Sequence, residues 1–265
     1  MRRTSRGQLF IKFAVAAMCF ASQYLHATEF IVVQLPHEWI IGADSKESAT
    51  RAYGGSHTVN KILYVGRFVV LRYGVDGGLG DENFDLDVAI KDALKEKTTE
   101  AGAYGALKQL FNETEQRMVE QHKRNKLTNK PENHVMTDDV FAQTYGIGFV
   151  LLSVDNGKPL IEDYHLVPQP DLKINWGTSR TILKARELYK PAIFSIPDVL
   201  SYTPESSVRT APVKVVRQLL REMGDRPEFS FGIGPPYVVT RFDGTSLQYV
   251  DDSGKSWSAR LDLYQ

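Results

Sequence analysis

The chain has 265 residues, of which 42% are hydrophobic and 24% are charged, an ordinary balance for a globular protein with a sizeable buried core. Its 32 Lys and Arg residues equal its 32 Asp and Glu residues in number, so the net charge gives no electrostatic reason to expect a nucleic-acid partner. The length fits one large domain better than two.

The first 27 residues have the layout of a secretory signal peptide. Four basic residues come first, and an uninterrupted apolar run of nine residues, 13–21, follows them. Nine apolar residues are too few to cross a bilayer as a helix. We expect signal peptidase to remove residues 1–27 behind Ala27, which leaves residues 28–265 as a single domain of a secreted or periplasmic protein. A cut behind Ala21 is the alternative, and it would place Ser22 at the N-terminus.

Cleavage behind Ala27 would also change the charge and the thiol content. It removes four basic residues and no acidic one, which leaves 28 Lys and Arg against 32 Asp and Glu and a net charge of −4. It removes Cys19, the only cysteine, so the mature chain would have neither a disulfide nor a thiol nucleophile.

Short apolar runs at the start of the remaining chain predict strands. We expect a hairpin of strands at 30–35 and 39–43, with apolar residues on both faces as in a sheet that is covered on both sides. A polar loop at 48–57 should lead to strands at 59–65 and 68–73, the second of which ends in a glycine-rich step, 74–78.

From Asp85 onward the apolar period changes from that of a strand to that of a helix. The apolar face of a first helix carries Leu86, Ile90 and Leu94, and that of a longer second helix carries Leu107, Leu110, Phe111 and Met118. Residues 123–137 are polar, and we expect an exposed loop there, with the basic run 123–126 as a solvated helix end.

Strands should return at 145–154 and 160–167, joined by Asn156-Gly157, a pair that favours a tight hairpin. We expect helices near 179–189 and 212–223, and a closing hairpin of strands at 237–241 and 247–250. This order of elements predicts an α+β fold, a four-layer αββα sandwich in which two antiparallel sheets lie between helix layers.

Three local patterns occur close together in the first third of the chain. Thr28 directly follows the leader, and Asp44 comes sixteen residues later within Gly42-Ala43-Asp44-Ser45-Lys46. Lys61 stands in the segment Thr58-Val59-Asn60-Lys61-Ile62, and the glycine-rich step 74–78 follows the fourth strand. Together these patterns resemble the proteasome β-type subunits of the N-terminal nucleophile (Ntn) hydrolase family, and the leader resembles that of an exported bacterial-type member. The likeness is dense over residues 28–80 and continues as element order to about residue 250.

The resemblance implies an N-terminal threonine hydrolase that cleaves amide or peptide bonds through an acyl-threonine intermediate. A free α-amino group, with a pKa of roughly 7.7–8.0, would take the proton from the hydroxyl of Thr28. Lys61 would favour the neutral amine and stabilise negative charge on the threonine oxygen, and Asp44 would keep Lys61 charged and oriented. The substrate would be a peptide or a small amide, and this chemistry needs no cofactor and no metal.

Further residues are assigned to the site by their position. The amide of Gly74 is the candidate oxyanion donor, because glycine permits a close approach of the backbone to a substrate carbonyl, and Gly77 is the alternative. The resemblance places Val59 in the substrate pocket. The resemblance also gives supporting roles to Thr178 and Ser179, where Gly177-Thr178-Ser179 approximates a Gly-Ser-Gly step of the family. It gives supporting roles to Asp225 and Ser230 as well, which are two residues farther apart than in the family.

A second class of function stays open. Proteasome-type subunits include inactive members, so the chain could be a catalytically inactive protein that serves in binding or assembly, as a homo-oligomer or otherwise. Ala27 stands where the family usually has a glycine for self-cleavage, and a chain that begins at Ser22 would carry no free threonine amine. The mature N-terminus therefore separates the two classes.

Overall fold

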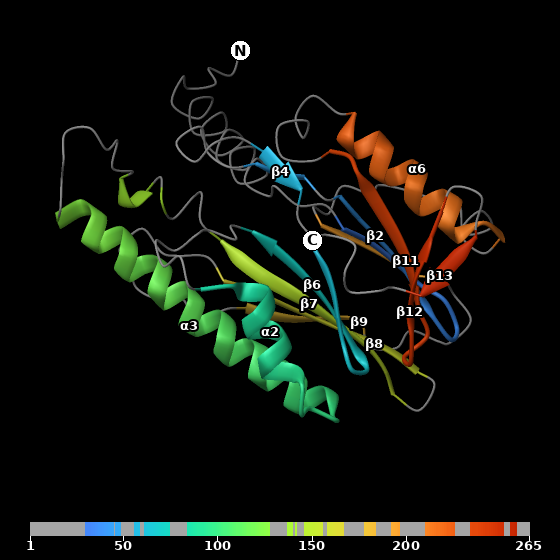
Figure 1. Cartoon of the computed structure of the whole chain (residues 1–265), viewed down its shortest axis with the longest axis horizontal. Helices are drawn as coiled ribbons and strands as arrows, with labels where there is room; N and C mark the ends of the chain where they lie inside the picture. The colour runs from blue at the N-terminus through green and yellow to red at the C-terminus, as the bar shows by residue number, and fades with distance from the viewer. Residues whose placement is uncertain are drawn as a thin grey trace, which may run out of the picture.

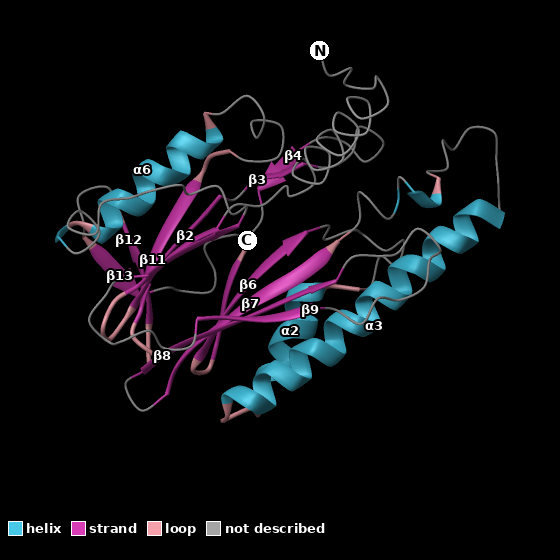
Figure 2. Ribbon diagram, turned by 180° about the vertical axis from the view of Figure 1, so that it is seen from behind, coloured by secondary structure: helices cyan, strands magenta, loops and turns pink. Residues whose placement is uncertain are grey.

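The structure, a computed structural model, describes residues 30–44, 46–48, 56–58, 61–74, 84–127, 137–139, 141, 146–155, 158–166, 178–183, 192–196, 210–225, 234–251 and 255–258. Two antiparallel sheets pack face to face, and helices cover their outer faces (Figure 1). Helices α2 (Leu86–Leu94) and α3 (Glu100–Leu127) lie on one sheet, and α6 (Pro212–Gly224) lies on the other, as Figure 2 shows from behind. The predicted four-layer αββα sandwich is confirmed.

The six-stranded sheet has the strand order β10-β1-β2-β11-β12-β13. Its strands are β1 (Phe30–Gln34), β2 (Trp39–Asp44), β10 (Ala192–Ile196), β11 (Tyr237–Phe242), β12 (Leu247–Val250) and β13 (Ser256–Ser258). Every residue of β1 and β2 is buried, because the second sheet contacts one face of these strands and α6 contacts the other. The two hairpins predicted for this sheet are confirmed.

The five-stranded sheet follows the chain in the order β5-β6-β7-β8-β9. Its strands are β5 (Ile62–Val65), β6 (Phe68–Gly74), β7 (Ile147–Asp155), β8 (Lys158–Leu166) and β9 (Thr178–Leu183). A separate two-stranded ladder pairs β3 (Lys46–Ser48) with β4 (Ser56–Thr58). The strands predicted near 59–65, 68–73, 145–154 and 160–167 are thereby confirmed, with β5 starting three residues later than expected.

The helices bury the apolar faces that their sequences predict. Asp85 caps α2, since its carboxylate accepts from the amides of Asp87 and Val88. The apolar face of α3 packs on the five-stranded sheet, where the ring centroids of Phe111 and Phe149 are 4.9 Å apart. No helix in the described ranges is both long and apolar enough to cross a membrane.

The helix predicted near 179–189 is wrong. Residues 178–183 form β9, which pairs with β8, and residues 192–196 form β10, which pairs with β1 along its whole length. Without β9 and β10, the strands β8 and β1 would be edge strands with unpaired backbone groups. Among the described residues, the helix layer over the six-stranded sheet consequently contains α6 rather than the two helices expected.

Parts of two predicted loops belong to regular elements. Residue 48 and residues 56–57 of the loop predicted at 48–57 belong to the β3–β4 ladder, in which Ser48 pairs with Ser56. Residues 123–127 of the loop predicted at 123–137 belong to α3, which continues through the basic run. A side-chain hydrogen bond from Gln121 to Asn125, one turn apart, supports this extra length.

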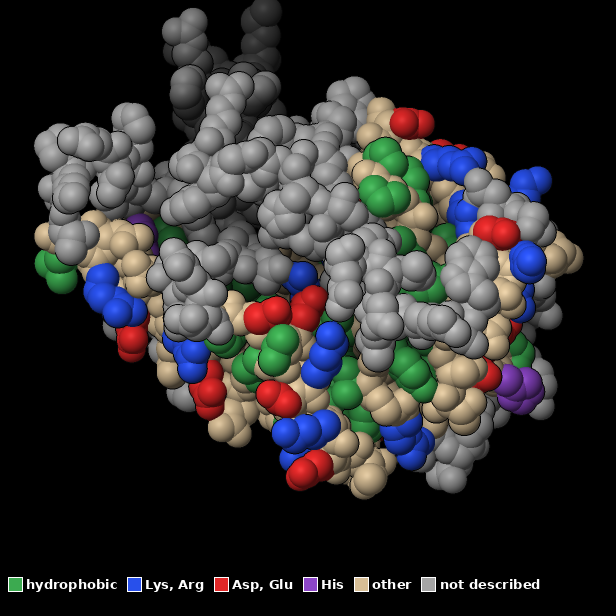
Figure 3. All heavy atoms as spheres, in the orientation of Figure 1, with side chains coloured by type: hydrophobic (Ala, Val, Ile, Leu, Met, Phe, Trp, Pro, Cys, Tyr) green, Lys and Arg blue, Asp and Glu red, His purple; other side chains and the backbone are tan. Residues whose placement is uncertain are grey.

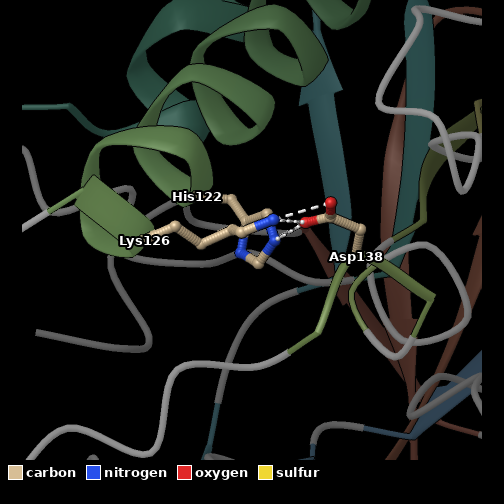
Figure 4. A network of polar contacts seen from close by, with 3 residues as sticks. All are labelled: His122, Lys126 and Asp138. Carbon is tan, nitrogen blue, oxygen red and sulfur yellow. Dashed lines mark hydrogen bonds and ion pairs between the residues drawn. The ribbon is translucent and has the colours of Figure 1, made fainter. Parts of the chain in front are cut away.

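Asp138 ties a short segment after α3 to the last turns of that helix (Figure 4). Its carboxylate accepts from Lys126 Nζ at 2.7 Å and lies 2.9 Å from His122 Nε2. Two hydrogen bonds hold the pKa of Asp138 below its ordinary value, the one from Lys126 with the larger effect and the one from His122 with the smaller. The His122 ring also stacks on Phe141 with 4.1 Å between centroids, so polar and apolar contacts both anchor this end of α3.

Charged side chains of both signs are interspersed over the described part of the face shown in Figure 3. This mixture agrees with the equal numbers of acidic and basic residues in the sequence.

Contacts between the two sheets close one end of the sandwich. Trp39, the first residue of β2, donates from Nε1 to the carbonyl of Ser153 on β7 at 3.1 Å. The hydroxyl of Tyr64 on β5 donates to the carbonyl of Thr245 in the β11–β12 turn at 2.6 Å. Gly244 in the same turn packs against Val154, where a Cβ atom would collide with the valine side chain. Both sheets are thus fixed to each other at the end where β2 begins.

Glu115 is a buried carboxylate on the packed face of α3. Its side chain is fully buried, and neither carboxylate oxygen has a hydrogen-bond partner among the described residues. Burial raises the pKa of Glu115 to about 7, because the charged form loses its hydration without gaining a partner.

We predict that the free energy of unfolding falls as pH rises from 4.5 to about 7, because the folded state holds the Glu115 proton that the unfolded state releases. Glu115 should account for about 3 kcal/mol of this fall in the free energy of unfolding. Glu115→Gln should remove this part of the pH dependence. Urea unfolding at pH 5 and pH 8 measures it, with Glu113→Gln at an exposed position of the same helix as the control. Equal pH slopes for the wild type and Glu115→Gln would contradict the assignment.

Candidate active site

A buried ion pair joins the two sheets at the end opposite to the closed one. Asp44 is the last residue of β2 in the six-stranded sheet, and Lys61 directly precedes β5 in the five-stranded sheet. Lys61 Nζ lies 2.9 Å from both carboxylate oxygens of Asp44. Asp44 is 0% exposed and Lys61 is 3% exposed, so the structure brings these two sequence-predicted residues into direct contact away from water.

Backbone pairing fixes both partners. β2 lies between β1 and β11, and Asp44 stands opposite Tyr237 on β11. On the other sheet, the amide of Arg72 on β6 donates to the carbonyl of Lys61 at 3.2 Å, which continues the β5–β6 ladder by one residue. Neither side chain therefore sits on a free loop, and the distance between Lys61 and Asp44 is set by how the two sheets pack.

The burial of this pair points to a role other than stability. Each ion loses its hydration when it is buried, and the attraction between them often only balances that cost. An apolar pair of similar size would often stabilise such a position as well or better. Charged groups held away from water are a common feature of catalytic sites.

Gly74 ends β6 on the same side of the five-stranded sheet. Arg72 is hydrogen-bonded to Lys61, and Gly74 follows two residues later. Gly74 has a φ of 91°, and a Cβ atom there would collide with the carbonyl oxygen of Gly146. Glycine is thus required by the backbone at this position, and the oxyanion role of Gly74 stays a prediction.

Other predicted site residues fall outside the described residues or have no described side chain. Thr28, Val59, Gly77 and Ser230 lie outside the described residues. Thr178 and Ser179 begin β9 and pair with His165 and Tyr164, and their side chains are not described. Asp225 is exposed just behind α6, where its amide donates to the carbonyl of Arg221. The catalytic role of Thr28 and the supporting and pocket roles of the other residues stay predictions.

Sequence reasoning missed a second polar contact at this end. The hydroxyl of Tyr73, next to Gly74, donates to Asp163 Oδ1 on β8 at 2.6 Å, and both residues are buried. The signal that could have revealed it is Gly146-Ile147-Gly148, because closely spaced glycines in a strand mark a close approach by a neighbour. Among the described residues, no group of three or more His, Cys, Asp or Glu side chains is placed to hold a metal ion.

Comparisons with known proteins give no sequence match, and they give matches to solved structures. The sequence matches no protein-family model and no curated protein sequence. The structure is similar to an Anbu (Gly-1) mutant from Hyphomicrobium sp. strain MC1, with 13% identity, 88% of each chain covered and a TM-score of 0.40. It is also similar to Anbu (ancestral beta-subunit) from Yersinia bercovieri, with 14% identity, 84% of this chain and 87% of that chain covered, and a TM-score of 0.40. Identities and TM-scores this low assign neither a family nor an activity to this chain.

We predict that Lys61→Met lowers the free energy of unfolding by about 3–5 kcal/mol, because it leaves the Asp44 carboxylate buried without its cation. A second substitution, Asp44→Leu, should restore part of the loss. Chemical denaturation of the two single variants and the double variant measures the coupling. Lys95→Met is the matched control, since Lys95 is 62% exposed and lies 3.3 Å from an exposed Asp92. A loss below about 1 kcal/mol for Lys61→Met, as expected of a surface pair, would contradict the burial of this one.

Proposed function

We propose that this protein is an exported N-terminal threonine hydrolase that cleaves a peptide or small amide through an acyl-threonine intermediate. The observation that carries the proposal is the buried contact between Lys61 and Asp44, two residues that the sequence alone selects. The proposal assigns the nucleophile and the base to Thr28, whose hydroxyl and α-amino group would act together.

The position of β1 supports a role for Thr28. Phe30 begins β1 opposite Ala43, the neighbour of Asp44, so the strand starts at the end of the sheet that holds the ion pair. Only Glu29 separates Thr28 from Phe30 in the sequence, and two residues of extended chain span about 7 Å at most. A mature chain that begins at Thr28 would therefore have its terminus close to this end of β2.

The proposed reaction follows from these groups. The neutral α-amino group takes the hydroxyl proton of Thr28 while the oxygen attacks the amide carbon. The α-ammonium then gives this proton to the leaving nitrogen, the carbon–nitrogen bond breaks, and an acyl ester and a free amine result. The Lys61 ammonium favours the neutral form of the amine and stabilises the developing negative charge, and Asp44 keeps Lys61 charged and in place. The Gly74 amide is the proposed donor to the oxyanion. Water then hydrolyses the ester and regenerates Thr28.

The proposal depends on maturation. Signal peptidase would cut behind Ala27 and expose the threonine amine, which places the active protein outside the cytoplasm. We propose no cofactor and no nucleic-acid partner, and a homo-oligomer is compatible with the proposal.

We predict that an alkyne-tagged β-lactone acylates the exported wild-type protein once, on Thr28, with a mass increase equal to the whole probe because ring opening has no leaving group. Peptide mapping by mass spectrometry locates the adduct. Thr28→Ala should abolish it and Thr28→Ser should retain it. Asp44→Asn should slow labelling by about 10²–10⁴-fold, because Lys61 loses the charge that keeps it protonated and oriented.

Lys95→Met changes an exposed residue directly after the end of α2 and serves as the control, which should be labelled at the wild-type rate. The proposal is wrong if a protein that begins at Thr28 and is folded by circular dichroism takes up no probe, or if Thr28→Ala is labelled as fast as the wild type. The first result would favour the inactive binding or assembly protein, and the second would assign the reactive nucleophile to a residue other than Thr28.

A further inference from the structure

Two glycines, Gly148 on β7 and Gly74 at the end of β6, allow these neighbouring strands to lie close together. A Cβ atom on Gly148 would collide with the phenol ring of Tyr73 and would lie 2.6 Å from its hydroxyl oxygen. The carbonyl of Gly146 occupies the place that a Cβ atom on Gly74 would need. Gly148 therefore makes room for the Tyr73 ring, and Gly74 makes room for the Gly146 carbonyl that precedes β7.

Tyr73 crosses β7 and reaches the next strand. Its backbone stands opposite Gly148, which in turn stands opposite His165 on β8. The Tyr73 hydroxyl donates to Asp163 Oδ1 at 2.6 Å, and the Tyr73 and His165 rings have centroids 5.5 Å apart. Tyr73 is 6% exposed and Asp163 is 8% exposed. A hydroxyl–carboxylate hydrogen bond of this length away from water is among the stronger ones that proteins make.

This bond lies between two parts of the candidate active site. Arg72, the residue before Tyr73, is hydrogen-bonded through its amide to the carbonyl of Lys61. Gly74, the residue after Tyr73, is the proposed oxyanion donor. A change in where Tyr73 sits would therefore move the backbone beside Lys61 and the amide of Gly74 together.

We infer that Tyr73 is a positioning residue: its hydrogen bond to Asp163, seated over Gly148, fixes the end of β6 and with it the Gly74 amide. The inference rests on the proposed function, because the exact place of that amide matters to chemistry only if it receives an oxyanion. Tyr73 acts through Gly74 and is not itself a catalytic residue.

The test uses a peptide boronic acid and the exported protein. The threonine oxygen adds to boron, the hydroxyl proton passes to the α-amino group, and the tetrahedral adduct presents an oxygen where the oxyanion would form. Tyr73→Phe, which keeps the ring and loses the hydroxyl, should raise the inhibition constant about tenfold. Asp163→Leu should do the same, and Asp163→Asn should stay near the wild type because its amide oxygen still accepts.

Tyr64→Phe is the matched control. It also loses one tyrosine hydrogen bond between distant segments, to the carbonyl of Thr245, but at the closed end of the sandwich. Its inhibition constant should equal that of the wild type.

A second readout does not depend on chemistry. Hydrogen exchange measured by mass spectrometry on a peptide that covers residues 68–74 should be faster in Tyr73→Phe than in the wild type and in Tyr64→Phe. Wild-type exchange together with a wild-type inhibition constant in Tyr73→Phe would overturn the inference. Failure of the boronic acid to bind a wild-type protein that begins at Thr28 would instead overturn the proposed function and the positioning role with it, and the exchange data would still decide whether the hydrogen bond holds β6.

Discussion

The structure depends on the ammonium group of Lys61, which is buried away from water and therefore needs a negatively charged partner inside the protein. Lys61 Nζ contacts both oxygens of Asp44 at 2.9 Å, and the two residues belong to different sheets. Neither charge is tolerable alone at this depth, so the end of β2 and the start of β5 have to meet. The apolar side chains between the sheets supply the burial, and the ion pair sets which strand ends come together.

The two ends of the sandwich consequently differ in character. At the end where β2 begins, Trp39 and Tyr64 donate to carbonyls of the opposite sheet, and Gly244 packs on Val154. At the other end, the contacts are between side chains that can carry charge. A sandwich fixed at one end by backbone acceptors keeps its ionisable groups at the other end in a constant relative position, which preorganised catalysis requires. The architecture thus suits a site placed between the strand ends.

Much of this arrangement could be predicted from the sequence. Continuous apolar runs predicted β1 and β2 as strands covered on both faces, and the helical period predicted α2, α3 and α6. Asp44 and Lys61 were selected by their spacing together with the resemblance to proteasome β-type subunits, and the structure pairs them. β9 was missed because a helix was predicted near 179–189, whereas residues 178–183 pair with β8. No element was predicted for β10, whose pairing partner β1 is distant in the chain. The Tyr73–Asp163 bond spans 90 residues and leaves only a pair of glycines as its local signal.

The proposed chemistry requires that Thr28 carry a free amine next to the end of β2. Edman sequencing or the intact mass of the protein recovered after export tests this most directly. We expect a single mature species that begins at Thr28 and lacks residues 1–27. A species that begins at Ser22, or at any other residue before Thr28, would place the threonine amine in a peptide bond and contradict the proposed chemistry. The αββα fold and its buried ion pair would then belong to a protein without this catalytic base.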